Sequence, residues 1–256
     1  MCLAVVALDA HPAYSLVIAA NRDEYHDRPA APAAWGDAPP FADILAGRDL
    51  KAGGTWLGVR RDGRWALVTN VREGGRNDST ARSRGDLVPR VLNAGDAPAA
   101  TVAAIAGAQD GYNGYNLLAG DVADAHWASN RGSGARRLGV GVHGLSNALL
   151  DTPWPKLVRT LRAVRAWAAR ADADTAALFA ALGDRARAAD AELPDTGVTR
   201  DWERLLSSPF IVGDRYGTRC STVLTVDRAG RAVFRERTFD AAGTPAAETV
   251  ETFAVR

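Results

Sequence analysis

The feature that most constrains this chain is a cysteine at its second position, directly before two apolar runs. If an aminopeptidase removes Met1, Cys2 becomes the amino terminus and carries a nucleophilic thiol and a free α-amine on one residue. The apolar runs cover residues 3–8 and 15–20 and are separated by a short polar segment that contains a proline. This pattern predicts an antiparallel hairpin, which would return residues 21–24, Asn-Arg-Asp-Glu, to the neighbourhood of Cys2.

Both runs are apolar at nearly every position rather than at alternate positions. Such runs predict strands that are covered on both faces, although a short apolar run is also compatible with a buried helix. We therefore expect Cys2 at the edge of a buried sheet.

The chain length and charge limit the fold and its partners. No Ser/Gly linker, charge block or repeat divides the 256 residues, so we expect residues 1–256 to form a single domain. Lys and Arg number 31 against 30 Asp and Glu, which leaves a formal net charge of +1. Because the sequence shows no basic face of the kind that nucleic acid requires, nucleic acid is not an expected partner.

The apolar content of the chain does not indicate a membrane protein. The first run is short, has no basic region before it and is followed by charged residues, so it does not resemble a secretory signal. No stretch is long enough to span a bilayer. Two cysteines exclude a disulfide framework and favour a reducing, cytoplasmic location. The abundance of Arg and Ala over Lys is typical of a high-GC bacterial sequence.

The segments after the hairpin alternate between turn-rich and strand-like patterns. Residues 27–41 are rich in Pro and Ala and predict a loop that lies on the body of the protein. Residues 53–59 and 65–70 predict two strands joined by an Asp-Gly turn, with Asn70 at the end of the second. The polar segment 77–84 is interpreted as a solvated loop, and its Arg-Ser-Arg-Gly run leaves an anion site as the alternative.

Helix and strand patterns fill the rest of the chain. Helices are predicted at residues 86–92, 97–108, from the prolines of 151–155 to about 171, 174–182 and 199–206. Strands are predicted at residues 115–120, 122–129, 138–145, 210–212, 218–226, 232–239 and 249–255. The period of two along residues 218–226 places Arg219 and Cys220 on opposite faces, so if Arg219 enters a site Cys220 does not. A disulfide between Cys2 and Cys220 is not expected.

Six sequence blocks carry a resemblance to a known family. They are Cys2, AANRDEY, GGTWLGV, Thr69-Asn70, GLSNALLDTPWPK and YGTRCSTVL. In this order they resemble the NRDE family, also called the transport-and-Golgi-organisation family, and the resemblance covers essentially the whole chain. That family is in turn similar to N-terminal-nucleophile hydrolases such as penicillin V acylase and bile salt hydrolase. The resemblance implies an α+β fold, a four-layer αββα sandwich of mostly antiparallel sheets.

The resemblance also implies roles for residues near the amino terminus. Cys2 matches the nucleophile, with its own α-amine as the base, and the alternative is an inert buried cysteine. Asp23 would orient the amine, and Arg22 would favour the thiolate and lower the pKa of the thiol. A solvated turn or a structural ion pair is the alternative for both. Because adjacent side chains of a strand point oppositely, we expect only one of them to face Cys2, and Arg22 is the less favoured of the two.

Three further positions match the distant family. Asn70 and Asn147 match the residues that donate hydrogen bonds to an oxyanion, and the alternative for each is a turn residue that satisfies its own backbone. Arg219 matches a late arginine near the thiol, with a structural arginine as the alternative. The sequence predicts no metal site.

The sequence leaves three functions open, given below in order of preference. The first is a cytosolic hydrolase that cleaves an amide or thioester of a small acyl substrate through Cys2 and requires no cofactor. The second is a carrier that binds haem or acyl-CoA in the same cleft, since the resemblance also extends to haem trafficking and lipid metabolism. No haem motif supports the carrier directly, and the histidines are scattered at positions 11, 26, 126 and 143. A purely structural interaction protein is the third and least favoured function.

Overall fold

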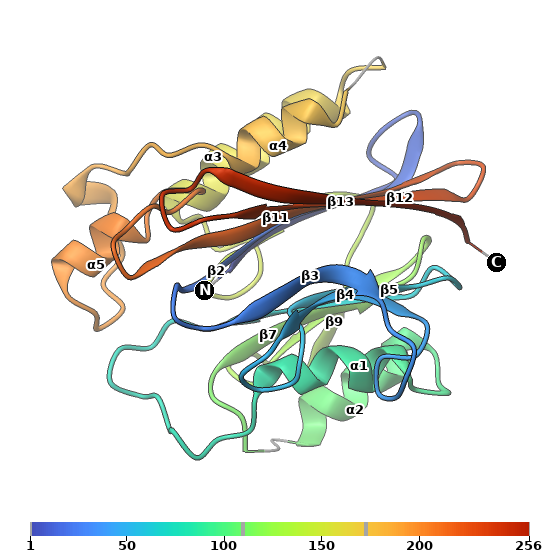
Figure 1. The fold of residues 1–256 in the computed structure, drawn as a ribbon, viewed down its shortest axis with the longest axis horizontal. Helices are drawn as coiled ribbons and strands as arrows, with labels where there is room; N and C mark the ends of the chain where they lie inside the picture. The colour runs from blue at the N-terminus through green and yellow to red at the C-terminus, as the bar shows by residue number, and fades with distance from the viewer. Residues whose placement is uncertain (1, 109–110, 172–173, 256) are drawn as a thin grey trace.

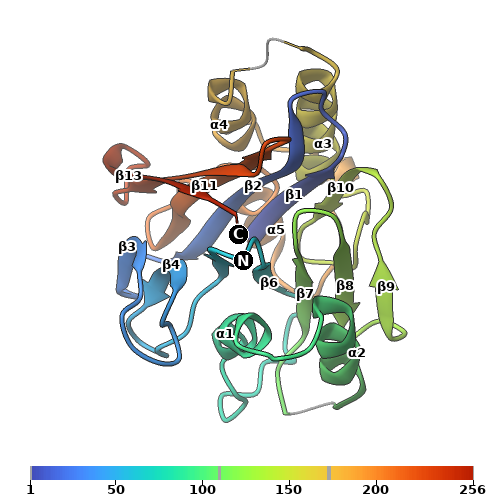
Figure 2. The ribbon, with the colours of Figure 1, turned by 90° about the vertical axis from the view of Figure 1, so that its right-hand side faces the viewer.

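Two antiparallel sheets lie face to face, and helices cover the outer side of each (Figure 1). The structure is a computed structural model that describes residues 2–108, 111–171 and 174–255. Helices α3 and α4 lie over the first sheet, and α1 and α2 lie over the second, as the end-on view also shows (Figure 2). The order of layers is therefore helix, sheet, sheet, helix, and the predicted α+β sandwich is confirmed.

The strands of the described residues form the two sheets in the following orders. The first sheet is β10 (Gly141–Leu145), β1 (Cys2–Leu8), β2 (Tyr14–Tyr25), β11 (Tyr216–Asp227), β12 (Arg231–Phe239) and β13 (Pro245–Ala254). The second is β3 (Ala30–Trp35), β4 (Ile44–Asp49), β5 (Leu57–Arg60), β6 (Trp65–Asn70), β7 (Tyr115–Gly120), β8 (Ala125–Ser129) and β9 (Ala135–Arg137).

The helices are short apart from α3. They are α1 (Leu87–Leu92), which follows the 3-10 turn η1 (Arg84–Asp86), α2 (Pro98–Ala108), α3 (Pro155–Ala168), α4 (Ala176–Leu182) and α5 (Arg200–Leu205), with a second 3-10 turn η2 (Asp190–Glu192). Pro155 occupies the first turn of α3, where its missing N–H costs no hydrogen bond. No helix of the described residues is long and apolar enough to cross a membrane.

Strands β1 and β2 are buried on both faces, as their apolar runs predict. Ala4, Val6 and Ile18 pack into the core between the two sheets. Leu3 and Val5 point the other way and pack against α3 and α4. The hairpin is confirmed, and its register pairs Leu3 with Asn21 and Cys2 with Arg22.

The sequence-based prediction is wrong in four places, one of which is the edge strand β9, where no strand is predicted over residues 135–137. Residues 27–41 contain a strand, β3, because an edge strand tolerates Pro32, whose missing N–H costs no ladder bond there. Strand β4 is missed, although residues 44–46 are fully buried. Residues 210–212 are not a strand, since their backbone bonds go to Asp184 and Thr218 rather than to a ladder.

Candidate active site

Cys2, Arg22 and Cys220 form a row across three neighbouring strands. Cys2 on β1 is paired with Arg22 on β2, and Arg22 is paired with Cys220 on β11. Side chains that are directly opposite in an antiparallel sheet lie on the same face. The row therefore lies on the face of the first sheet that is turned towards the second sheet, with Arg22 between the two thiols. Both cysteines are free thiols in the structure.

Asp23 lies on the opposite face of β2 from Arg22. Its buried carboxylate accepts a hydrogen bond of 2.7 Å from the Thr218 hydroxyl. Asn21, two residues earlier and on the same face, donates to the carbonyls of Leu182 and Pro209 on the helix side. The predicted alternation is confirmed, but Arg22 and not Asp23 shares the face of Cys2. The expectation that disfavoured Arg22 is wrong, because the strand pairing decides the face.

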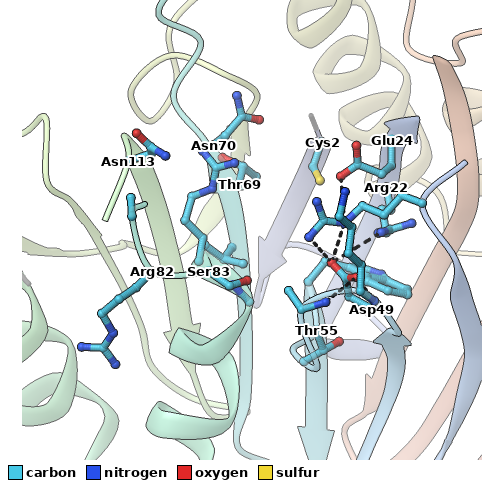
Figure 3. A pocket seen from close by; sticks show the side chains of 18 of the residues that line it. Cys2, Arg22, Glu24, Asp49, Thr55, Thr69, Asn70, Arg82, Ser83 and Asn113 are labelled. Carbon is cyan, nitrogen blue, oxygen red and sulfur yellow. Dashed lines mark hydrogen bonds and ion pairs between the residues drawn. The ribbon is translucent and has the colours of Figure 1, made fainter. Parts of the chain in front are cut away.

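A polar cavity of about 430 Å³, which we call the Cys2 cavity, opens at the edge of the row. Cys2 lies half-buried on one wall beside Glu24 and Arg22, and Thr69 and Asn70 lie across the cavity (Figure 3). Among its other lining residues are Arg28, Asp49, Thr55, Trp56, Arg82, Ser83 and Arg84. Charged and polar side chains therefore dominate this cavity.

The charged groups beside Cys2 are paired with one another. Arg28 donates to Asp49 Oδ2 from both Nε and Nη2, at 2.8 and 2.7 Å. Although burial raises the pKa of Asp49, the hydrogen bond and charge of Arg28 bring that pKa below its usual value. Arg22 lies 4.0 Å from the same carboxylate and stacks over the Trp56 ring at 4.5 Å. The Arg22 guanidinium is thus held by contacts on two sides.

The thiols do not have the lowered pKa that the sequence analysis expects for Cys2. Burial raises the pKa of Cys2, and the charge of Arg22 opposes this shift without reversing it. The pKa of Cys220 is raised well above its usual value, again by burial first and then by the neighbouring Glu236. The expectation is wrong because desolvation of Cys2 outweighs the positive charges near it, those of the amino terminus and of Arg22.

A series of side-chain hydrogen bonds, made by residues that do not line the cavity, holds Asn70 in place. Asn147 Nδ2 donates to Asn70 Oδ1 at 3.0 Å, and Lys156 Nζ donates to Asn147 Oδ1 at 3.1 Å. Asn147 is fully buried, with 0% of its surface exposed, and does not line the Cys2 cavity. Asn70 lines the cavity, and its Nδ2 makes only a 3.3 Å bond to the Val71 carbonyl. Asn70 is therefore positioned to donate to a ligand, whereas Asn147 holds Asn70.

Lys156, for which the sequence predicts no role, is only 1% exposed. Burial lowers the pKa of Lys156 to about 8, while the charge of Asp23 raises it. Burial also raises the pKa of Asp23, and the Lys156 charge opposes that shift. The signal that could have found Lys156 is its spacing of four and eight residues from the buried Thr160 and Val164 on α3.

Arg219 lies outside the Cys2 cavity. The register between β2 and β11 shifts between Thr218 and Cys220, which leaves Arg219 as the extra residue of a β-bulge. Its Nη1 donates to the His26 carbonyl at 3.0 Å, and it lines a different cavity together with Cys220. The prediction that Arg219 and Cys220 point away from each other is therefore wrong, because a bulge breaks the period of two.

The polar segment before η1 contributes to the Cys2 cavity. Arg82, Ser83 and Arg84 line it, and Arg84 Nη1 donates to the Gly114 carbonyl at 3.1 Å. This placement differs from a purely solvated loop, since Ser83 and Arg84 are half-buried. Within the residues that the structure describes, no group of His, Cys, Asp and Glu side chains could hold a metal ion.

The comparison with protein families decides where this chain belongs. The family described as Transport and Golgi organisation 2 matches residues 1–241. The chain belongs to this family. The resemblance drawn from Asn-Arg-Asp-Glu and the other blocks is thus confirmed.

Mammalian members of the Transport and Golgi organisation 2 family align with nearly the whole chain. The Bos taurus homolog is 36% identical over 263 residues, which cover 93% of this chain and 92% of the relative. The Homo sapiens homolog is 35% identical over 259 residues with the same coverage.

Solved structures with little sequence identity share the fold. The C2A mutant of a conjugated bile acid hydrolase from Clostridium perfringens has a TM-score of 0.50 at 9% identity, with 99% of this chain and 92% of that chain covered. The N-acylethanolamine-hydrolyzing acid amidase of Caenorhabditis elegans has a TM-score of 0.51 at 12% identity, with 87% and 92% covered. These likenesses show the fold of the N-terminal-nucleophile hydrolases.

Proposed function

We propose that this chain is an N-terminal-nucleophile hydrolase that cleaves an amide or a thioester of a small acyl substrate. The observation that carries the proposal is the position of Cys2, which starts the first strand of an αββα sandwich and lines a polar cavity with Asn70 opposite. The names of the two structural neighbours, a hydrolase and an amidase, support this class of reaction. A cytosolic location stays a prediction.

The proposed reaction begins with removal of Met1, which lies outside the described residues. The Cys2 sulfur attacks the carbonyl carbon, and the thiol proton moves to the α-amine of the same residue. The oxyanion of the tetrahedral intermediate accepts a hydrogen bond from Asn70 Nδ2, a contact that can lower the barrier by about 3 kcal/mol. Collapse breaks the C–N or C–S bond of the substrate, and the α-ammonium gives its proton to the leaving group.

The second half of the reaction releases the acid. Water attacks the thioester formed with Cys2 and gives a proton to the α-amine. The new tetrahedral intermediate collapses, the bond between the acyl carbon and sulfur breaks, and the proton returns to the Cys2 thiolate. The substrate thus yields a carboxylic acid and a free amine or thiol.

The residues around Cys2 have different roles in the proposed reaction. Arg22, on the same face as Cys2, stabilises the thiolate. Asp23, on the opposite face of β2, holds the ammonium form of the amine through its charge. Asn147 acts through Asn70 as a positioning residue rather than as a direct oxyanion donor, since its amide is already bonded. Arg219 has no part in this step, because it does not line the Cys2 cavity.

The test is turnover of a panel of acyl amides and acyl thioesters by protein with an unmodified amino terminus. Wild type should turn over at least one member of the panel. The Cys2→Ala variant should show no turnover, although it should unfold at the same temperature as wild type. Intact-mass analysis must show loss of Met1, because an amide-linked Cys2 nitrogen cannot act as the base. Retention of Met1 in active protein would refute the mechanism.

The carrier hypothesis is an outcome of the same experiment. A haem or acyl-CoA carrier needs extended apolar walls, whereas the apolar residues that line the Cys2 cavity are Trp56, Val68 and two alanines. Binding of haem or acyl-CoA by wild type and Cys2→Ala alike, without any turnover, would favour the carrier.

A further inference from the structure

A second cavity of about 190 Å³ lies on the other side of Arg22 from Cys2. Its walls come from β3, β11 and β12, and Cys2 does not line it. Arg22 and Trp56 line both cavities and therefore form a shared wall. We call this space the Cys220 cavity, after the thiol that faces it.

Two buried guanidinium nitrogens at this cavity lack a hydrogen-bond acceptor. Arg22 is 5% exposed, and its Nη1 has no partner among the described residues, while its Nη2 lies near Asp49. The Nε of Arg219 is likewise buried without a partner in the described part of the chain. A buried charged donor without an acceptor destabilises the folded chain, because it loses its hydrogen bond to water without gaining another. Both arginines line the Cys220 cavity, so an acceptor placed there would remove this cost.

The one carboxyl group of this cavity does not supply that acceptor. Glu236 is 1% exposed, and its Oε1 accepts from the Ala33 backbone N–H at 2.8 Å. Its Oε2 accepts from the Thr222 hydroxyl at 3.1 Å. Within the described residues no ion pair joins Glu236 to Arg22 or Arg219, and burial raises the pKa of Glu236. Glu236 therefore gives neither guanidinium group a direct acceptor inside the cavity.

The remaining walls and the size of the cavity limit what fits. Trp56, Phe239, Pro32 and two alanines give it apolar sides. A water molecule occupies about 30 Å³ of liquid, so the volume corresponds to roughly six waters or to one small organic molecule. A fitting ligand has a compact anionic end for the guanidinium groups and a short hydrocarbon chain for the rings.

We infer that the Cys220 cavity binds a short-chain carboxylate. The carboxylate accepts hydrogen bonds from Arg22 Nη1 and Arg219 Nε, and the chain packs against Trp56 and Phe239. Planar guanidinium groups match carboxylate oxygens in geometry and charge. The inference does not rest on the proposed hydrolysis, because Cys2 does not line this cavity and the experiment measures binding rather than turnover.

The experiment titrates the full chain with butyrate and with the neutral isostere butyramide, by calorimetry and thermal unfolding at constant ionic strength. Butyrate at millimolar concentrations should bind and raise the unfolding temperature, as any ligand of the native state does, whereas butyramide should not. Equal binding of both would show that the site does not select a carboxylate, and binding of neither would show that it binds no short-chain acid; either result would overturn the inference.

Variants assign the binding to this cavity. Arg219→Met should weaken butyrate binding at least about tenfold, the effect of losing one charge-assisted hydrogen bond. Arg215→Met is the matched control, since Arg215 is exposed four residues earlier, and it should bind as wild type does. Loss of binding in both variants to the same degree would contradict the assignment.

Two more variants test whether butyrate binds in the Cys220 cavity or in the Cys2 cavity. Ala31→Leu keeps both arginines and fills the space with a side chain, so it should also abolish butyrate binding while the protein stays folded. Arg84→Met changes only the Cys2 cavity and should leave binding intact. If Arg84→Met abolishes binding and Ala31→Leu does not, the carboxylate binds beside Cys2 and the inference is wrong.

Discussion

Arg22 and Asp23 are neighbours in the sequence, yet their side chains enter two different environments. The Arg22 side faces cavities, and its charges, such as the Arg28–Asp49 pair, lie at a partly exposed wall. The Asp23 side is sealed by α3 and α5, and its charged residues are almost fully buried. We call these the open face and the sealed face of β2.

The contacts of the sealed face differ in kind from those of the open face. Arg72 donates to Glu203 on α5 at 2.6 Å and stacks over Trp154 at 4.4 Å. The Arg72 backbone N–H also donates to the Asn147 carbonyl at 2.7 Å. The sealed face therefore ties α5 to the residues that hold Asn70. Charge on the open face is available to ligands, whereas charge on the sealed face fixes the shape of the site.

Breaking one ion pair on each face should give the largest contrast. Glu203→Gln leaves the Arg72 guanidinium buried without its counter-charge, which should lower the free energy of unfolding by about 3–5 kcal/mol. Asp49→Asn, the matched change on the open face, should lower it by about 1 kcal/mol, because water reaches this pair. Urea denaturation of both variants measures the difference. Equal losses would mean that the two faces do not differ in burial as described.

Lys156 should make the stability of the sealed face depend on pH. Its pKa in the folded chain is about 8, below the 10.5 of a free lysine, so the unfolded chain binds more protons between these values. The free energy of unfolding should therefore rise from pH 8 to 10.5, by up to roughly 3 kcal/mol from this group.

Lys156→Met isolates that contribution. The groups that face Lys156 are Asp23, Arg72, Cys2 and Glu203, and their own titration is present in both proteins. The difference between wild type and variant should grow in favour of wild type as the pH rises. A constant difference across this range would show that Lys156 keeps its ordinary pKa.

The sequence predicts the layers and strands better than it predicts the faces. Runs that are apolar at every position reveal β1 and β2, because strands covered on both sides need apolar residues on both sides. The period of two reveals that Arg22 and Asp23 diverge. It cannot say which of them shares the face of Cys2, since that depends on the pairing register of the hairpin formed by β1 and β2.

The sequence also fails to place three site residues correctly, because their positions depend on strand pairing and packing. The bulge inserts one residue, and that residue, Arg219, is neither a glycine nor a proline that would mark a bulge. Asn147 matches the family position, but only the structure shows that its amide is occupied by Asn70. Burial of Lys156 follows from the packing of α3 on the sheet, which overrides the usual exposure of lysine.

Substitutions of Asn70 and Asn147 should distinguish a residue that contacts the oxyanion from a residue that only positions it. Asn70→Ala should lower kcat about 100-fold, the effect of losing an oxyanion donor, and lower the free energy of unfolding by about 1 kcal/mol or less. Asn147→Leu should lower the free energy of unfolding by about 1–3 kcal/mol, because it leaves Lys156 without an acceptor, and should reduce kcat by a smaller factor. Steady-state kinetics with denaturation of each variant decides this. A larger kcat loss in Asn147→Leu than in Asn70→Ala would return Asn147 to the role of direct donor.

The smallest expected effect concerns the thiols of the open face. Cys2 should react slowly with iodoacetamide at neutral pH and faster as the pH rises, because burial raises its pKa and the thiolate is the reactive form. Cys220, which is 3% exposed, should stay unlabelled in the folded protein. Arg22→Met should slow the labelling of Cys2 by roughly two- to fivefold, because the positive charge of Arg22 lowers the pKa of this thiol and its loss leaves less thiolate. Arg82→Met, on a more exposed part of the same cavity, is the control and should leave the rate unchanged. Mass spectrometry of each alkylated cysteine over time gives the rates, and faster labelling of Cys2 in Arg22→Met would mean that Arg22 shields the thiol instead of stabilising its thiolate.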